Sequence, residues 1–127
     1  MLGGLLALLI AGLIVYLPAL DRVFVYDDIL VVRDNRFIEQ PGHLLQLHGQ
    51  AYLRAAGERT YRPLLTATYI FDHLIWGKSP FGFGLTNLLM HVLAAWLLGL
   101  LLLRMWPSRP SLAAWSALFY LWHPSLV

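Results

Sequence analysis

The chain contains no cysteine and few charged residues. The absence of cysteine from all 127 residues excludes thiol chemistry, and it removes the usual indicator of the redox compartment. Charged side chains make up 13% of the residues and the formal net charge is only +2. Because no basic stripe with interleaved aromatics occurs, nucleic acid is not expected as a partner.

Several motifs of soluble enzymes are also missing. The sequence has no glycine-rich phosphate loop and no nucleophile elbow. Three histidines, His43, His48 and His73, do not form a recognisable ligand spacing, so no metal site is predicted.

Long apolar runs are what the sequence has instead. Hydrophobic residues make up 59% of the chain and the mean hydropathy is +0.65, which predicts an all-α integral membrane protein. Residues 2–20 and 85–103 carry no full charge and are long enough to cross a hydrocarbon core of about 30 Å. Residues 112–124 form a third, shorter segment, so two to three transmembrane helices are expected.

A signal peptide is the competing interpretation of the first run. It fits poorly, because no lysine or arginine precedes residues 2–20 and no A-x-A-like site follows before Asp21.

Two arginines predict how the chain crosses the membrane. Arg104 and Arg109 lie in the short loop 104–111, and the positive-inside rule places such a loop in the cytoplasm. The N-terminus is then cytoplasmic as well, and the long loop 21–84 is periplasmic or luminal. Residues 1–127 are treated as a single membrane module with this multi-pass topology.

Two helices are predicted within loop 21–84. One covers residues 41–56 and has a mixed face suited to the membrane surface. The other covers residues 63–76, with Pro63 at its first position and Gly77 after its end. This second helix is apolar almost all round, which predicts burial among other helices or in the membrane interface. Residues 78–84 are predicted to be a turn-rich connection to the second span.

An acidic pair and several polar residues are the candidates for a site. Asp27 and Asp28 follow the first span; because adjacent carboxylates repel, the pair is either well solvated or retained for chemistry. Asn87 and His91 are four residues apart and share a helix face, and His123 ends the third segment. The topology would bring all five groups to the outer membrane surface. Ionisable groups in or near a membrane span suggest a functional site.

Each of these residues also has a purely structural interpretation. The acids can solvate the helix exit, His91 can donate a single interhelical hydrogen bond, and His123 before Pro124 can mark a helix stop. Arg62 can contact a lipid headgroup, or its guanidinium can act as a phosphate clamp.

The ordered set of motifs resembles the membrane glycosyltransferases of the C-type fold. The resemblance is greatest to the N-terminal part of the transmembrane O-mannosyltransferases that carry tetratricopeptide repeats, and of their bacterial relatives. It extends from about residue 5 to residue 124. The matching elements are Phe24-Val25-Tyr26-Asp27-Asp28, Asn35 with Ile38, Tyr61-Arg62-Pro63-Leu64, Tyr69, Leu74-Ile75-Trp76-Gly77, Pro80-Phe81-Gly82-Phe83, Asn87-Leu88-Leu89-Met90-His91 and His123-Pro124.

The resemblance implies transfer of a sugar from a polyprenyl-phosphate carrier to a protein hydroxyl on the outer or luminal face. Asp27 would be the general base and Asp28 would orient it, although the two roles can be exchanged. Arg62, Asn87, His91 and His123 would be the substrate-binding residues, with Asn87 and His91 supporting the acidic loop from behind. Beyond the polyprenyl-phosphate-linked sugar, no cofactor is expected.

The sequence also departs from the family pattern. Gly84 occupies a position where the family often has histidine, and residues 125–127 do not continue the usual run.

Three spans are few for enclosing both a lipid-linked donor and a protein acceptor, because such sites are clefts between helices. The chain is therefore expected to be a fragment or a split part of a transferase. The alternative is a non-catalytic accessory subunit that stabilises a larger membrane complex. Small residues at Ala94, Ala95 and Gly99 would allow close helix packing in that case. The expected partners are membrane lipids, together with other membrane subunits or the rest of the transferase.

Overall fold

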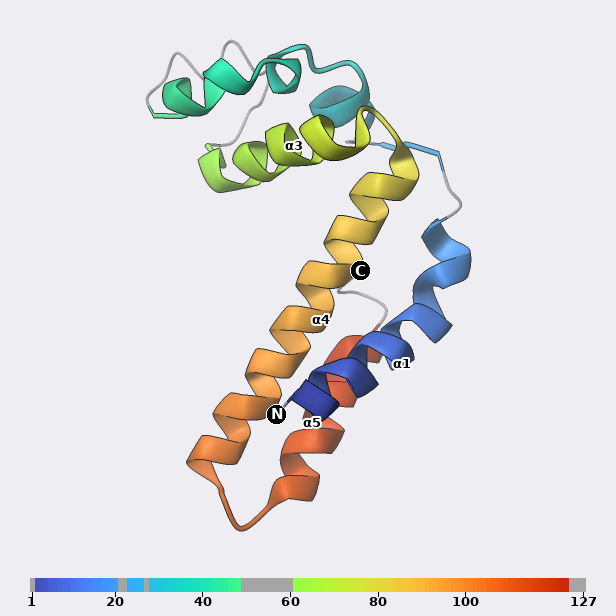
Figure 1. Cartoon of the computed structure of the whole chain (residues 1–127), viewed down its shortest axis with the longest axis vertical. Helices are drawn as coiled ribbons and strands as arrows, with labels where there is room; N and C mark the ends of the chain where they lie inside the picture. The colour runs from blue at the N-terminus through green and yellow to red at the C-terminus, as the bar shows by residue number, and fades with distance from the viewer. Residues whose placement is uncertain (1, 21–22, 27, 49–60, 124–127) are drawn as a thin grey trace. The chain divides into compact units, whose positions relative to one another are not determined.

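A computed structural model describes residues 2–20, 23–26, 28–48 and 61–123 (Figure 1). All regular structure in these ranges is helical, which confirms the prediction of an all-α protein. The chain divides into two compact units. The bundle unit consists of residues 1–21 and 84–127, and the loop unit consists of residues 22–83. Each unit is described separately below.

Three helices build the bundle unit. They are α1 (Leu2–Leu20), α4 (Pro80–Met105), whose first turn belongs to the loop unit, and α5 (Pro110–Trp122). Pro110 opens α5 at a position where a missing backbone N–H costs nothing. Between α4 and α5 the chain turns through a hydrogen bond of 3.0 Å from the Arg109 N–H to the Trp106 carbonyl.

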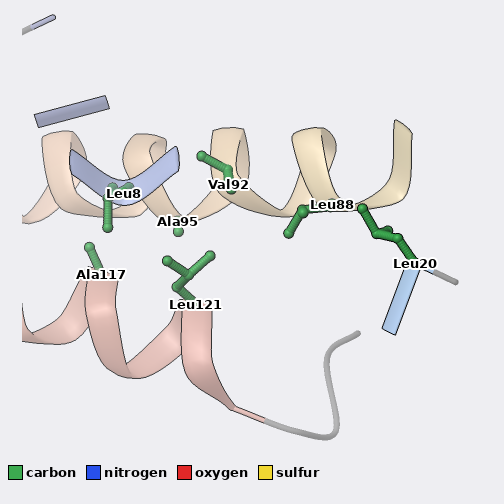
Figure 2. Packing of buried hydrophobic residues seen from close by; sticks show 7 residues of the cluster. All are labelled: Leu8, Leu20, Leu88, Val92, Ala95, Ala117 and Leu121. Carbon is green, nitrogen blue, oxygen red and sulfur yellow. The ribbon is translucent and has the colours of Figure 1, made fainter. Parts of the chain in front are cut away.

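The three helices share one small core. Figure 2 shows Ala117 and Leu121 of α5 pointing toward residues of α1 and α4. Gly12 permits close approach of α1, because a Cβ at that position would lie 3.1 Å from Cγ2 of Val92. The buried members of the core are Leu8, Leu20, Leu88, Val92, Ala95, Ala117 and Leu121.

Two of these helices are long and apolar enough to cross a membrane. They are α1, over Gly3–Leu20, and α4. Only 17% and 22% of their most apolar windows are buried within the protein, whereas a core helix of a soluble protein would be mostly buried. Their exposed apolar surface therefore requires lipid as its solvent, and the protein is a membrane protein. At 1.5 Å per residue, the 13 residues of α5 extend only about 20 Å, which is short for a span.

The loop unit is built from short helical turns around one longer helix. Its elements are η1 (Ile29–Arg33), η2 (Phe37–Glu39), η3 (Pro41–Gln46), α3 (Pro63–Trp76) and the first turn of α4. Helix α3 packs against η2 and η3. The buried core of this unit comprises Val32, Phe37, Ile38, Leu47, Ile70 and Phe83.

The predicted bounds of α3 are confirmed, and the predicted helix 41–56 begins at Pro41 as expected but ends too early. A 3₁₀ helix ends at Gln46, and residues 47–48 are not helical. Such helices stay short because their hydrogen-bond geometry is poor. Here the ring Nδ1 of His43 also lies 2.8 Å from the carbonyl oxygen of Phe37, which ties the turn to η2. The second half of that prediction, residues 49–56, lies outside the described residues.

The predicted turn-rich segment 78–84 is also wrong, because α4 begins at Pro80 rather than at residue 85. The chain reverses earlier, at Gly77, whose φ of 61° lies in the left-handed region that favours glycine. Gly82 then serves packing rather than turning. A Cβ at Gly82 would collide with Cγ of Trp76, so only glycine leaves room for the indole.

Candidate functional site

Asp28, the described member of the acidic pair, lies immediately before η1. Asp28 is exposed, and its backbone N–H donates a hydrogen bond of 3.1 Å to the carbonyl of Val25. Asp27 lies outside the described residues. Within the turn, Tyr26 is 91% exposed and has a φ of 48°, a conformation that costs an L-residue roughly 1–2 kcal/mol. The turn thus presents the Asp28 carboxylate to the surroundings from a strained backbone, a feature that clusters at functional sites.

Arg62 is exposed at the start of α3. Its carbonyl accepts bonds from the backbone N–H of Thr66 (3.1 Å) and from the Thr66 hydroxyl (3.3 Å). The helix therefore fixes the backbone of Arg62, and the residue itself is exposed. An exposed planar guanidinium can bind a phosphate with two parallel hydrogen bonds.

Ion pairs occupy two other acids of the loop unit. Asp34 binds Arg33 at 2.8 Å, and Glu39 binds Lys78 at 2.6 Å. Hydrogen bonds from these cations hold the pKa of both carboxyl groups below the usual range. Lys78 also donates to the Arg33 carbonyl at 2.7 Å.

A fourth acid, Asp72, is buried. Among the described acids of this unit, Asp28 is thus the exposed one that lies outside both ion pairs. No three histidine, aspartate or glutamate residues come together as potential metal ligands in the part of the chain that the structure describes.

In the bundle unit, His91 donates a hydrogen bond to a carbonyl oxygen in the last turn of α5. Its Nε2 lies 3.1 Å from the carbonyl oxygen of Leu121, and the Tyr16 hydroxyl donates to the same oxygen at 2.9 Å. A carbonyl only accepts, so His91 Nε2 carries the hydrogen. Carbonyls in the last turn of a helix lack a partner within the helix, and here α1 and α4 each supply one. We call Tyr16, His91 and the Leu121 carbonyl the α5 clasp.

Ring contacts hold the imidazole of the clasp in place. His91 stacks on Tyr120 with ring centroids 5.1 Å apart, and it meets Tyr16 edge-on at 6.4 Å. His91 is buried, as expected for a side chain that stabilises the packing of α4 against α5.

The other two predicted residues of this unit have different environments. Asn87 is exposed although it lies four residues before His91 on the same helix. His123 caps the C-terminus of α5, and its ring meets Phe119 edge-on at 5.9 Å. The structure therefore brings His91 and His123 to the same end of α5. Their convergence with Asp28 and Arg62 stays a prediction.

Sequence reasoning missed Tyr16 and Tyr120. A signal for Tyr16 was present, because it carries the only polar side-chain group within the first apolar run, residues 2–20. A tyrosine hydroxyl in such surroundings needs a hydrogen-bond acceptor. Tyr120 offered no comparable signal, since its role depends on how α5 packs against α4.

Comparison with known proteins finds several relatives that are named protein O-mannosyl-transferases. The chain is 30% identical to the protein O-mannosyl-transferase Tmtc1 of Drosophila melanogaster over 98% of its own length and 15% of that protein. It is 29% identical to Tmtc3 of the same species over 68% of this chain and 10% of the relative. It is 32% identical to human TMTC2 over 63% of this chain and 10% of the relative. No family model and no solved structure matches the chain.

Proposed function

We propose that this chain, which is homologous to the Tmtc protein O-mannosyl-transferases, supplies the acidic-loop module of a membrane glycosyltransferase. The homology, 30% identity over 98% of the chain, makes the protein glycosyltransferase-like. The chain spans about 15% of the length of that relative. The activity of a whole transferase is therefore the proposal, with this chain as a fragment or a split part of it.

The proposed reaction moves a mannosyl group from a polyprenyl-phosphate carrier to a protein hydroxyl. A carboxylate of the acidic pair takes the proton from the acceptor hydroxyl, and the acceptor oxygen forms a bond to C1 of the sugar. The bond between C1 and the phosphate oxygen breaks, and the electron pair leaves on the polyprenyl phosphate. General-base assistance of this kind contributes about 10²–10⁴-fold to a rate.

Three parts of the chain have roles in this proposal. Asp27 acts as the base, with Asp28 orienting it or exchanging roles with it. Arg62 binds the phosphate of the carrier lipid. Asn87, His91 and His123 contribute to substrate binding.

The exposure of Asp28 is the structural observation that favours this function. A base for an external protein hydroxyl must be accessible, and Asp28 is exposed while Asp34 and Glu39 are held by cations. The strained Tyr26 immediately before the pair is consistent with a turn retained for function.

The test measures mannosyl transfer in membranes that contain this chain together with the proteins it assembles with. Radiolabelled polyprenyl-phosphate mannose and an acceptor peptide are supplied on the outer side. Asp27→Asn or Asp28→Asn should lower the transfer rate by about 100-fold or more. Asp34→Asn is the matched control, because Asp34 is an exposed acid of the same unit, and it should leave the rate within about twofold.

Transfer at the unmodified rate in both Asp27→Asn and Asp28→Asn would refute the base assignment. The absence of any transfer that depends on this chain would favour the accessory role.

One observation favours that second candidate. Helix α5 exposes Trp115, Phe119 and Trp122, which are spaced to share one face that a partner helix can cover. The small residues Ala95 and Gly99, in contrast, do not support it. Ala95 is buried in the bundle core, and a Cβ on Gly99 would lie 3.4 Å from Cβ of Ala117. An accessory subunit would copurify at fixed stoichiometry with a complex that stays functional in the Asp27→Asn/Asp28→Asn variant.

A further inference from the structure

The bundle unit contains an apolar groove between its three helices. The groove has a volume of about 380 Å³, which is within the usual range for a small-molecule site. Small residues leave this space open, since Ala7 of α1, Gly99 of α4 and Ala114 of α5 all line it. None of the described residues that line the groove carries a charge, so it suits a hydrocarbon ligand.

The groove is too small to seat a further transmembrane helix. Along α5 its lining runs from Pro110 to Leu118, which is about 12 Å at 1.5 Å per residue. A spanning helix covers about 30 Å, and even 12 Å of a helix about 10 Å wide occupies on the order of 900 Å³. An acyl chain is narrower, and in one leaflet it extends over about half of the hydrocarbon thickness.

Two arginines lie at one end of this groove. Leu103 and Pro110 line the groove, and their neighbours in the sequence, Arg104 and Arg109, are exposed. The hydrogen bond of 3.0 Å from the Arg109 N–H to the Trp106 carbonyl closes the turn between α4 and α5 (Figure 1), so both cations lie at the same end of the bundle. From the start of α4 onward the sequence contains no acid. This end of the groove is therefore positively charged.

An unfilled groove is unfavourable in a membrane. Its lining atoms would lack van der Waals partners, and water does not enter an apolar cavity. Guanidinium groups bind phosphate oxygens through parallel hydrogen bonds, and basic residues beside transmembrane helices recognise anionic lipid headgroups.

We propose that the groove binds one acyl chain of an anionic phospholipid, whose phosphate is held by Arg104 and Arg109. The bound lipid contacts all three helices of the bundle unit and stabilises their packing. This inference goes beyond the proposed function and does not depend on it.

The experiment measures lipid binding to the full chain by native mass spectrometry from detergent micelles. Phosphatidylglycerol and phosphatidylcholine are added in turn, and the unmodified chain should bind one phosphatidylglycerol about tenfold or more tightly than phosphatidylcholine. Ala7→Phe and Ala114→Phe fill the groove from two different helices, and each should weaken phosphatidylglycerol binding by about tenfold or more. Ala19→Phe is the matched control, because Ala19 is an exposed alanine of α1 outside the groove, and it should leave the affinity unchanged.

Substitution of the arginines tests the headgroup contact separately. Arg104→Gln/Arg109→Gln should reduce the preference for phosphatidylglycerol to within about twofold, whereas Arg104→Lys/Arg109→Lys should keep most of it, because lysine also binds phosphate as a point charge.

Equal binding of the two lipids by the unmodified chain would overturn the proposal, as would undiminished phosphatidylglycerol binding in both filling variants. A dimer that the filling variants dissociate would show that a second copy occupies the groove, which would also overturn it. Circular dichroism identifies a variant that does not fold. The lipid preference of the unmodified chain and of the arginine variants, which are changed at exposed positions, decides the proposal even if a filling variant fails.

Discussion

At the scale of single residues, the carbonyl oxygen of Leu121 organises one end of the bundle unit. It accepts hydrogen bonds from both Tyr16 and His91, so three helices meet at one acceptor. His91 thereby has a structural role that the sequence offered only as the alternative to function. The hydrogen bond from His91 also holds the last turn of α5, which ends at His123.

Removal of one donor from the α5 clasp should have a small, measurable cost. Tyr16→Phe should lower the free energy of unfolding by about 0.5–1.5 kcal/mol, since His91 still satisfies the carbonyl. Tyr120→Phe is the control, because it keeps the stacked ring and should change stability by less than about 0.5 kcal/mol. Equilibrium unfolding in mixed detergent micelles measures both values. Equal stability of the two variants would show that the Tyr16 bond contributes nothing.

The Glu39–Lys78 pair should make the loop unit sensitive to acid. The pair lowers the pKa of Glu39 from its usual 4.5, chiefly through the hydrogen bond from Lys78. A carboxyl group whose pKa is lower in the folded state stabilises that state at pH values above 4.5. This contribution is lost as the pH falls below that value and through the folded-state pKa.

Hydrogen exchange of a peptide covering residues 28–48, corrected for intrinsic rates, should therefore show loss of protection below pH 4.5. Lys78→Met should reduce this pH dependence. The remaining dependence is expected from Asp34, whose pKa is also lowered. A pH profile that Lys78→Met leaves unchanged would contradict the assignment.

At the scale of elements, the corner between α3 and α4 lies within the loop unit, a few residues before the chain continues into the bundle unit at residue 84. Gly77 makes the reversal and Gly82 makes room for Trp76. Residues that usually disrupt a helix are tolerated in the first two turns of α4 because the packed indole and the buried Phe83 stabilise them.

Gly82→Ala should therefore destabilise the protein even though alanine is the better helix former. The added methyl group overlaps the Trp76 ring, and overpacking of this kind costs about 1–3 kcal/mol. In a Trp76→Ala background the same change should be neutral or favourable. Gly4→Ala in α1 is the control, because a Cβ there meets nothing within 4 Å; it should be neutral or stabilise by up to about 1 kcal/mol. Thermal unfolding followed by circular dichroism separates these outcomes.

At the scale of the whole molecule, the proposed reaction requires one orientation in the membrane. The acidic loop must face the outer or luminal side, and the loop between α4 and α5 must face the cytoplasm. Introduced cysteines report this orientation directly, because the natural chain has none.

Ser108→Cys should react with a membrane-impermeant maleimide only in inverted vesicles, because the positive-inside rule predicts a cytoplasmic loop at Arg104 and Arg109. Leu45→Cys should react only in right-side-out vesicles. Reaction of Ser108→Cys from the outer side would reverse the topology and place the acidic pair on the wrong face for the proposed chemistry.

The sequence by itself determined the features that depend on local chemistry. Apolar runs predicted α1 and α5 to within about two residues at each end. Pro63 and Gly77 set the bounds of α3, since proline suits a first helical position and glycine permits a positive φ. The relationship to the O-mannosyl-transferases was also indicated at this level, because each of the ordered motifs is a short run of neighbouring residues.

Only the tertiary structure decided the features that depend on contacts between distant residues. The sequence predicted Gly82 to lie in a turn, whereas it lies in α4 and packs against the Trp76 ring. Asn87 and His91 have the same periodicity, but α1 and α5 bury only His91. Glu39 pairs with Lys78, which lies far from it in the sequence, whereas Asp28 remains exposed. Periodicity fixes the direction of a side chain on its own helix, and only packing decides what that side chain meets.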